Sequence, residues 1–210
     1  MALMASAQKT AAQPGTPKIG LRERKKIQTR QAIRRAAYRL FAEQGYEAAS
    51  VDRIAEAADV SPSTVFRYFP TREDIVLTDE YPPLLEAELR ARPADEPMAE
   101  SMRHVAVEAL RRLPAEEHAE LVQRARLIRE VPAIRGRTAE NAVRDSAMIS
   151  AVLAERTGRS ADDLEVRVIS TAILAGLQEA LLLWVADGQQ DDLGTLIGRS
   201  MDVLGRGLTL

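Results

Sequence analysis

Apolar residues recur with the period of an α-helix along most of this 210-residue chain. A first helix is expected from about residue 20, because the apolar positions that follow fall at i, i+3, i+4, i+7 and i+8: Ile33, Ala36, Ala37, Leu40 and Phe41. The same period predicts later helices over residues 98–113, 115–130, 133–157, 161–186 and 192–206. No segment shows the alternation typical of a strand, so we expect an all-α fold with about nine helices.

Capping residues predict two short helices after the first one. Gly45 suits the left-handed position that follows the last turn of a helix. Ser50 can cap a second helix, and Ser61 can cap a third whose first residue is Pro62. The tight turn expected between these two helices gives the N-terminal region the form of a helix-turn-helix.

Two further segments have the form of a capping box. Residues 71–74 (TRED) predict the start of a fourth helix, which Pro82-Pro83 should kink or break before it continues to Arg90. Residues 160–163 (SADD) are expected to begin the long helix over residues 161–186.

Charge and aromatic residues divide the chain into two regions. Residues 1–78 carry 13 Lys and Arg against 8 Asp and Glu, whereas residues 79–210 carry 16 against 23. Seven of the eight aromatic residues lie between Tyr38 and Tyr81. The chain has no Cys and only two His, in no metal-ligand spacing, and no phosphate-binding loop or nucleophile elbow, so we expect no cofactor, no metal and no enzymatic activity.

The third helix is expected to read DNA, with its N-terminal side chains at base edges in the major groove. Arg67 can pair with a guanine, and the basic run that precedes the first helix can follow the phosphate backbone. Three alternatives stay open: a merely solvated basic helix face, a Thr64 hydroxyl bonded to its own backbone, and an Arg67–Glu73 pair. The candidate DNA-binding residues are Arg24, Lys25, Lys26, Ser50, Ser61, Pro62, Ser63, Thr64, Arg67, Tyr68 and Arg72.

Residues 29–75 resemble the DNA-binding domain of the TetR (tetracycline-repressor-like) family. The blocks LFAEQGY, VDRIAEAADVS and TVFRYFPTRED occur in order and at the family's spacing. Three residues depart from the family pattern: Asp59 stands where Gly is usual, Phe66 where Tyr is frequent, and Arg72 where Lys is usual. Asp tolerates the left-handed conformation that the turn requires, so we expect the turn to survive.

The resemblance implies a helical ligand-binding and dimerisation domain behind the DNA-binding domain. We therefore expect a disordered tail over residues 1–19, a helix-turn-helix domain over 20–70 and the second domain over 71–210. In this family the last two helices usually form a homodimer, and the apolar second half of residues 161–186 fits a helix buried on two sides. The expected interface residues are Ala172, Ala175, Leu182, Leu193, Leu196, Ile197 and Leu204.

An effector pocket is expected in the second domain, which also resembles family members that sense acyl-CoA-like ligands. Its candidate residues are otherwise simply core: Leu85, Leu89, Met102, Val105, Asn141, Met148, Val152, Ile173, Leu177, Gln178 and Trp184.

These expectations combine into a homodimeric repressor that binds a palindromic double-stranded operator and is released by a hydrophobic or acyl-CoA-like effector. Two alternatives remain: an activator or architectural protein of the same fold without an effector, and a helical enzyme with a vestigial helix-turn-helix. The longest uncharged stretch of the apolar C-terminal region, residues 168–178, is too short for a membrane span, and residues 1–7 lack the basic start of a signal peptide. We therefore expect a cytoplasmic protein without a membrane partner.

Overall fold

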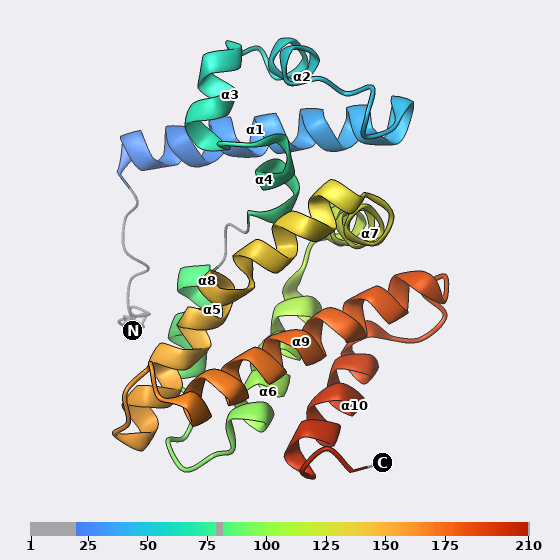
Figure 1. Ribbon diagram of the computed structural model, residues 1–210. Coiled ribbons are helices and arrows are strands. Elements are labelled where there is room, and N and C mark those ends of the chain that lie inside the picture. Colours follow the sequence, from blue (N-terminus) through green and yellow to red (C-terminus); the bar gives the residue numbers. More distant parts are fainter. Residues whose placement is uncertain (1–19, 79–81, 210) are drawn as a thin grey trace, which may run out of the picture.

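The computed structural model describes residues 20–78 and 82–209, so the tail expected over residues 1–19 lies outside the described part (Figure 1). The described residues form ten helices and no strand, which confirms the all-α fold. The helices are α1 (Leu21–Gln44), α2 (Val51–Ala57), α3 (Pro62–Tyr68), α4 (Arg72–Leu77), α5 (Pro82–Arg90), α6 (Met98–Arg112), α7 (Ala115–Glu130), α8 (Pro132–Thr157), α9 (Leu164–Ala186) and α10 (Leu193–Gly205).

The count exceeds nine because the expected fourth helix is broken into α4 and α5. The capping box at its start is present: the Thr71 side chain accepts from the Asp74 amide, and the Asp74 carboxylate accepts from the Thr71 amide. Helix α4 ends at Leu77, and α5 begins at Pro82. Proline is tolerated at the first positions of a helix, where no amide hydrogen bond is needed, so the two prolines start a new helix.

The start expected for α9 is wrong by three residues. The Ser160 hydroxyl accepts from the Asp162 amide in a local turn, and the helix begins only at Leu164, after Asp163. A Ser side chain can bond to the amide two residues on as readily as it caps a helix, and the sequence pattern does not separate the two outcomes. Gly45 has the expected positive φ of 84° after α1, but its ψ of 161° lies outside the left-handed helical region.

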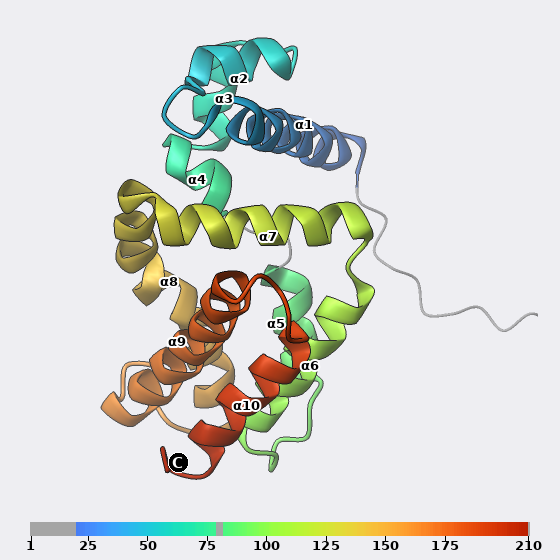
Figure 2. The ribbon, with the colours of Figure 1, turned by 90° about the vertical axis from the view of Figure 1, so that its right-hand side faces the viewer.

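The helices pack around two hydrophobic cores. The N-terminal core joins α1–α4 and includes Ile33, Phe41, Ile54, Val65 and Phe69. The C-terminal core lies between α5, α6, α8, α9 and α10, below α7 in the view of Figure 2. Helices α7 and α8 contribute to both cores: α7 through Ile128 and Ala125, and α8 through Ile134 and Ile149.

Helix α9 is the most apolar element of the C-terminal half. Among the described helices, it alone has the length and composition of a membrane span. Buried helices of globular proteins meet the same criteria, and α9 packs against α8, α10 and α7. At Gly176 it approaches α10 closely: the Ser200 hydroxyl donates to the Gly176 carbonyl over 2.8 Å, in the space where a side chain at position 176 would lie.

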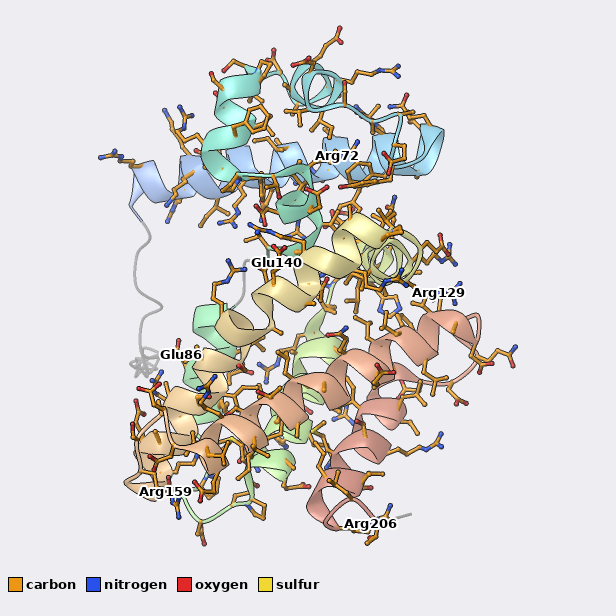
Figure 3. All side chains as sticks on the ribbon, viewed as in Figure 1. Arg72, Glu86, Arg129, Glu140, Arg159 and Arg206 are labelled. Carbon is orange, nitrogen blue, oxygen red and sulfur yellow. The ribbon has the colours of Figure 1, made fainter. Side chains whose placement is uncertain are left out.

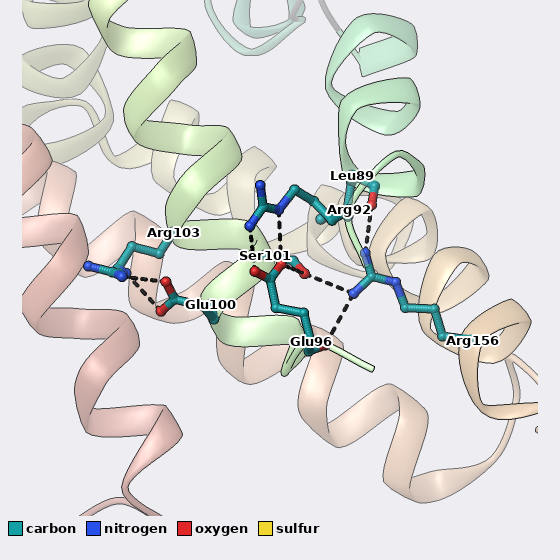
Figure 4. Close-up of polar contacts among 7 residues, drawn as sticks. All are labelled: Leu89, Arg92, Glu96, Glu100, Ser101, Arg103 and Arg156. Carbon is teal, nitrogen blue, oxygen red and sulfur yellow. Dashed lines mark hydrogen bonds and ion pairs between the residues drawn. The ribbon is translucent and has the colours of Figure 1, made fainter. Parts of the chain in front are cut away.

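A polar network fastens the connection between α5 and α6 to α8 (Figure 4). The Arg156 guanidinium donates to the Leu89 carbonyl over 2.6 Å and to the hydroxyl of the buried Ser101 over 2.8 Å. Glu96 accepts from Arg92 over 2.9 Å and from the Ser101 hydroxyl. The hydrogen bonds from Arg92 and Ser101 lower the pKa of Glu96 to about 2. The network therefore stays charged and holds three helices together at neutral pH.

Candidate nucleic-acid interface and ligand cavity

Helices α2 and α3 have the short, capped form that a helix-turn-helix requires. The Ser50 hydroxyl accepts from the Arg53 amide over 3.3 Å, and the Ser61 hydroxyl accepts from the Thr64 amide over 3.2 Å. Between the helices the chain turns at Asp59, whose φ is +54°, as expected for Asp in place of the family's Gly. Ile54 and Val65 anchor the two helices in the N-terminal core, so their outer faces stay free.

The outward side of α3 carries hydroxyl groups at its N-terminus and a cation one turn later. The Ser61 hydroxyl lies 2.9 Å from the hydroxyls of both Ser63 and Thr64. Arg67 is exposed, and its guanidinium lies 5.4 Å from the ring centre of the half-buried Tyr68. Small hydroxylated residues allow a close approach to base edges, and an exposed guanidinium can pair with a guanine.

Two of the alternatives raised by the sequence can be compared with these contacts. None of the ion pairs among the described residues joins Arg67 to Glu73, whose carboxylate instead accepts from the Tyr46 hydroxyl over 2.8 Å. The Thr64 hydroxyl does share in the capping of α3 through Ser61. The Thr64 hydroxyl is therefore part of a hydroxyl cluster at the start of α3, whereas the Arg67 guanidinium is exposed and available for a DNA contact.

Arg72 has a different position from the one expected of a phosphate contact. Its guanidinium donates to the Tyr46 carbonyl over 3.0 Å and to the Ala49 carbonyl over 3.4 Å, and lies 4.0 Å from the centre of the Tyr46 ring (Figure 3). These contacts fasten the loop between α1 and α2 to α4. Arg72 therefore supports the helix-turn-helix from within the protein, and its contact with a DNA phosphate stays a prediction.

The basic start of α1 lies beside α3. Arg24, Lys25 and Lys26 are exposed on its first turns, and Arg30, further along the same helix, lies 5.2 Å from the ring centre of Phe69 at the end of α3. At a rise of about 1.5 Å per residue, the three cations are about 6–9 Å from Arg30 along the helix axis. The candidates for phosphate contacts on α1 therefore lie near the helix that carries the candidates for base contacts.

Phe66 is a residue of this surface that sequence reasoning set aside. Its side chain on α3 is 51% exposed, which is unusual for a large apolar group. Its spacing in the sequence could have indicated this exposure. Val65 and Phe69 point to the core, which leaves Phe66 on the outer face of the helix. An exposed aromatic ring at this place can contact a thymine methyl group.

Comparison with known proteins gives two family matches that together cover most of the chain. Residues 33–78 match the family of bacterial regulatory proteins described as the tetR family, and residues 96–209 match the family described as the MftR C-terminal domain. A transcriptional repressor of Corynebacterium diphtheriae, AcnR, is 32% identical over 171 residues, which cover 78% of this chain and 85% of AcnR. The chain belongs to the TetR family of transcriptional regulators.

Other relatives of this TetR-family regulator are known from sequence or structure. The regulator TcmR of Streptomyces glaucescens is 42% identical, but the match covers only 44% of this chain and 41% of TcmR. The crystal structure of the repressor FadR of Thermus thermophilus, in complex with lauroyl-CoA, is 25% identical and has a TM-score of 0.57 over 86% of this chain and 95% of FadR. FadR of Bacillus subtilis, in complex with stearoyl-CoA, is 22% identical with a TM-score of 0.58 and shows a shared fold.

A cavity of about 630 Å³ lies where the two halves of this TetR-family regulator meet. Its apolar wall comes from α5, α6, α7, α9 and α10, and its charged wall from α1, α5, α6 and α7. The apolar residues include Leu85, Leu110, Leu121, Leu177, Leu181 and Ile197. The charged ones are Arg34, Arg35, Glu88, Arg112, Glu116, Glu117, Glu120 and Arg124.

Most of the pocket residues expected from the sequence lie elsewhere. Only Leu85 and Leu177 line this cavity. Trp184 lines a second cavity of about 430 Å³ next to His118, whose ring centre is 5.4 Å away. The other eight residues line neither cavity, and the apolar ones among them lie in the C-terminal core or pack against it: Leu89, Met102, Val105, Asn141, Met148, Val152, Ile173 and Gln178.

Polar contacts between described residues join the DNA-binding half to α7 and α8. Gln123 donates to the Tyr38 carbonyl over 2.7 Å, and Arg124 donates to the Leu77 carbonyl over 3.3 Å. Arg34 pairs with Glu120 at 3.4 Å. On α8, Arg137 pairs with the buried Asp74 of α4 at 3.2 Å. Burial alone would raise the pKa of Asp74, but hydrogen bonds from Arg137 and Thr71 outweigh it and hold this pKa below its usual value.

The expected dimer residues separate into two groups. Leu193, Leu196 and Ile197 are buried in the C-terminal core, with Leu204 packed against it, and Leu182 packs against the N-terminal core. The apolar side of α10 therefore packs on α6 and α9 within the same subunit. Leu182 and Leu204 are only half-buried, so their place in a dimer interface stays a prediction. Ala175 is exposed and Ala172 is half-buried on α9, whose outward side also carries exposed large apolar residues: Leu164, Val168, Ile169 and Leu183.

Proposed function

We propose that this TetR-family regulator is a cytoplasmic, homodimeric transcriptional repressor that a small amphipathic effector releases from a palindromic operator. The observation that carries the DNA-binding part is the outer face of α3, where three hydroxyl groups and the exposed Arg67 project beside the basic start of α1. The related AcnR and FadR proteins are named repressors.

The dimer is supported by the outer face of α9. Its exposed leucines, isoleucine and valine form an apolar surface that a soluble monomer rarely presents. An isologous contact across a two-fold axis covers the same face on both copies. It also places two α3 helices for half-sites about 34–36 Å apart, or a multiple of that spacing, so the expected operator is an inverted repeat.

Release by an effector is supported by the position of the cavity. A volume of about 630 Å³ falls within the usual range for small-molecule sites, and the apolar wall suits a hydrocarbon chain. The related Thermus FadR binds lauroyl-CoA, which makes an acyl chain a reasonable occupant here as well. A ligand that fits only one arrangement of the two halves shifts the spacing of the α3 helices and thereby weakens operator binding.

The experiment that tests this function selects DNA from a random-sequence library with the full-length protein. We expect an enriched inverted repeat bound by one dimer, and acyl thioesters, fatty acids and apolar drugs are then screened for release of that DNA by fluorescence anisotropy. Failure to enrich any sequence would overturn the operator-binding function. An enriched operator that no compound releases would favour the effector-free regulator of the same fold.

A further inference from the structure

Helix α1 forms part of the cavity wall, although it belongs to the DNA-binding half. Gln31, Arg34 and Arg35 line the cavity together with leucines of α6, α7 and α9. Helix α1 lies above α7 and the C-terminal helices in the view of Figure 2. A molecule that fills the cavity therefore touches both halves of the protein at once. We propose that the effector is an amphiphile with an anionic head group, that this head group binds Arg34 and Arg35 of α1, and that it displaces Glu120 from Arg34.

The contact between Arg34 and Glu120 is suited to replacement. The two charged groups are 3.4 Å apart through one nitrogen and one oxygen, whereas strong charge-assisted hydrogen bonds are about 2.7–2.9 Å long. A carboxylate that enters from the cavity can bind a guanidinium through two parallel hydrogen bonds, a geometry that arginine favours. The incoming head group thus offers Arg34 a stronger contact than the one it makes with Glu120.

Arg35 adds a second cation next to the first. Its side chain is exposed at the cavity, and none of the ion pairs among the described residues involves it. The carboxylates at the cavity are placed differently: Glu88 already pairs with Arg112, and Glu116 and Glu117 lie in the first turn of α7, where the helix dipole stabilises negative charge. Two more cations line the cavity from the C-terminal half, but Arg112 pairs with Glu88 and Arg124 donates to the Leu77 carbonyl. Arg34 and Arg35 are therefore the cavity cations that the DNA-binding half supplies, and the apolar wall comes from the other half.

This arrangement gives the effector a direct effect on the DNA-binding half. Glu120 sits on α7, three residues before Gln123, which donates to the Tyr38 carbonyl of α1. Displacing Glu120 removes one of the contacts that fix α1 on α7, and α1 carries the basic turns beside α3. The inference rests on the proposed release by an effector, and it assigns the head-group charge and the residues that sense it.

The test compares three probes of equal chain length: dodecanoate, dodecanol and dodecylammonium. Binding to the full-length protein is measured by titration calorimetry in the absence of DNA. We expect dodecanoate to bind at least tenfold more tightly than dodecanol, and dodecylammonium to bind most weakly. Equal binding of the acid and the alcohol, tighter binding of the amine, or no binding of any probe would each overturn the inference.

Three variants locate the effect. Arg34→Gln and Arg35→Gln are expected to reduce the preference for the acid over the alcohol to less than threefold, and Arg39→Gln, an exposed position on the same helix outside the cavity, should leave it unchanged. Circular dichroism checks that each variant is folded, and Arg35, being exposed, can be replaced without disturbing a core. Retention of the full preference in both cavity variants would contradict the assignment.

The removal of Glu120 separates binding from release. In Glu120→Gln the competitor for Arg34 is gone, so we expect dodecanoate to bind severalfold more tightly but to release selected operator DNA less than in the wild-type protein. Unchanged release would show that the pair transmits nothing. The head-group comparison needs no DNA, so it tests the assigned charge even if no operator is found. If some other compound releases the operator, the proposed function is supported although this inference has failed.

Discussion

Replacing Leu183 with Glu should convert the proposed dimer into a folded monomer. Leu183 lies on the outer face of α9 and is 55% exposed in the single chain. Fully burying a leucine side chain contributes about 1.5–3 kcal/mol, so covering the exposed part of Leu183 in a dimer contributes about 1 kcal/mol per subunit. Two subunits then lose about 2 kcal/mol of dimer stability through lost burial, or about thirtyfold in the dissociation constant.

The introduced carboxylate adds to this loss. Burying an unpaired charge costs several kcal/mol more, and the two-fold axis brings the two new charges toward one another. We therefore expect dimer dissociation to be favoured by more than about a hundredfold, which sedimentation velocity over a range of protein concentrations measures. Operator affinity should fall in parallel, because a monomer binds one half-site.

Two matched variants test the assignment of the dimer interface to the outer face of α9. Leu208→Glu changes a leucine that is 71% exposed but lies beyond α10, and it should leave the dimer intact. Leu196→Glu places the charge in the C-terminal core, where Leu196 is 4% exposed, and should unfold the subunit. A Leu183→Glu protein that remains dimeric, or a Leu196→Glu protein that becomes a folded monomer, would refute the assignment of the interface to α9.

Three further predictions concern DNA binding and pH. Arg67→Ala should cost about 1–3 kcal/mol on the selected operator and relax discrimination at one base pair per half-site, as measured by anisotropy on single-base variants. Replacing Arg24, Lys25 and Lys26 with Gln should flatten the slope of log K against log salt concentration by about 0.9 for each lost phosphate contact. Hydrogen bonds from Arg92 and Ser101 depress the pKa of Glu96 from 4.5 to about 2, so they stabilise the fold above pH 4.5, and this contribution is lost as the pH falls toward 2. Urea denaturation across that range should show a smaller pH dependence for Glu96→Gln.

Each of these predictions has an outcome that would contradict it. An equal loss of affinity for scrambled DNA in Arg67→Ala would identify a phosphate contact instead of base reading. An unchanged salt slope would remove the start of α1 from the interface. For the acid-dependent stability, the control is Glu130→Gln, an exposed substitution at the end of α7. If Glu96→Gln lost as much stability as the wild type when the pH falls, the role assigned to Glu96 would be wrong.

The N-terminal half could be predicted in detail because short-range rules determine it. Capping by Ser50, Ser61 and Thr71 depends on residues three positions apart, and all three caps are present. Asp59 takes the left-handed conformation because Asp is one of the few residue types that tolerate it, whatever its long-range neighbours. Arg72 could not be predicted in this way, since its partners lie 23–26 residues earlier in the chain.

The C-terminal half shows what a periodic pattern leaves undecided. An apolar stripe shows that a face is covered, but not whether its neighbour is the same chain, a second copy or a ligand. Leu196 and Leu183 are both leucines on amphipathic helices, yet one faces α6 and the other faces outward. The cavity could not be predicted for a related reason: eight of its twenty lining residues are charged, and Arg34 and Glu120 meet although they are 86 residues apart in the chain.

The sharing of α7 and α8 between the two cores has a consequence for the evolution and engineering of this protein. Ile128 and Ile134 complete the N-terminal core from outside its own segment of sequence, and Asp74 of α4 finds its cation on α8. A fragment that ended at residue 78 would expose the apolar surfaces that these isoleucines cover. It would also leave the Asp74 carboxylate without its partner Arg137. The DNA-binding domain therefore cannot be transferred to another protein on its own. Recombination that exchanges it for the equivalent segment of a relative must carry matching positions on α7 and α8, or the chimaera will lose stability.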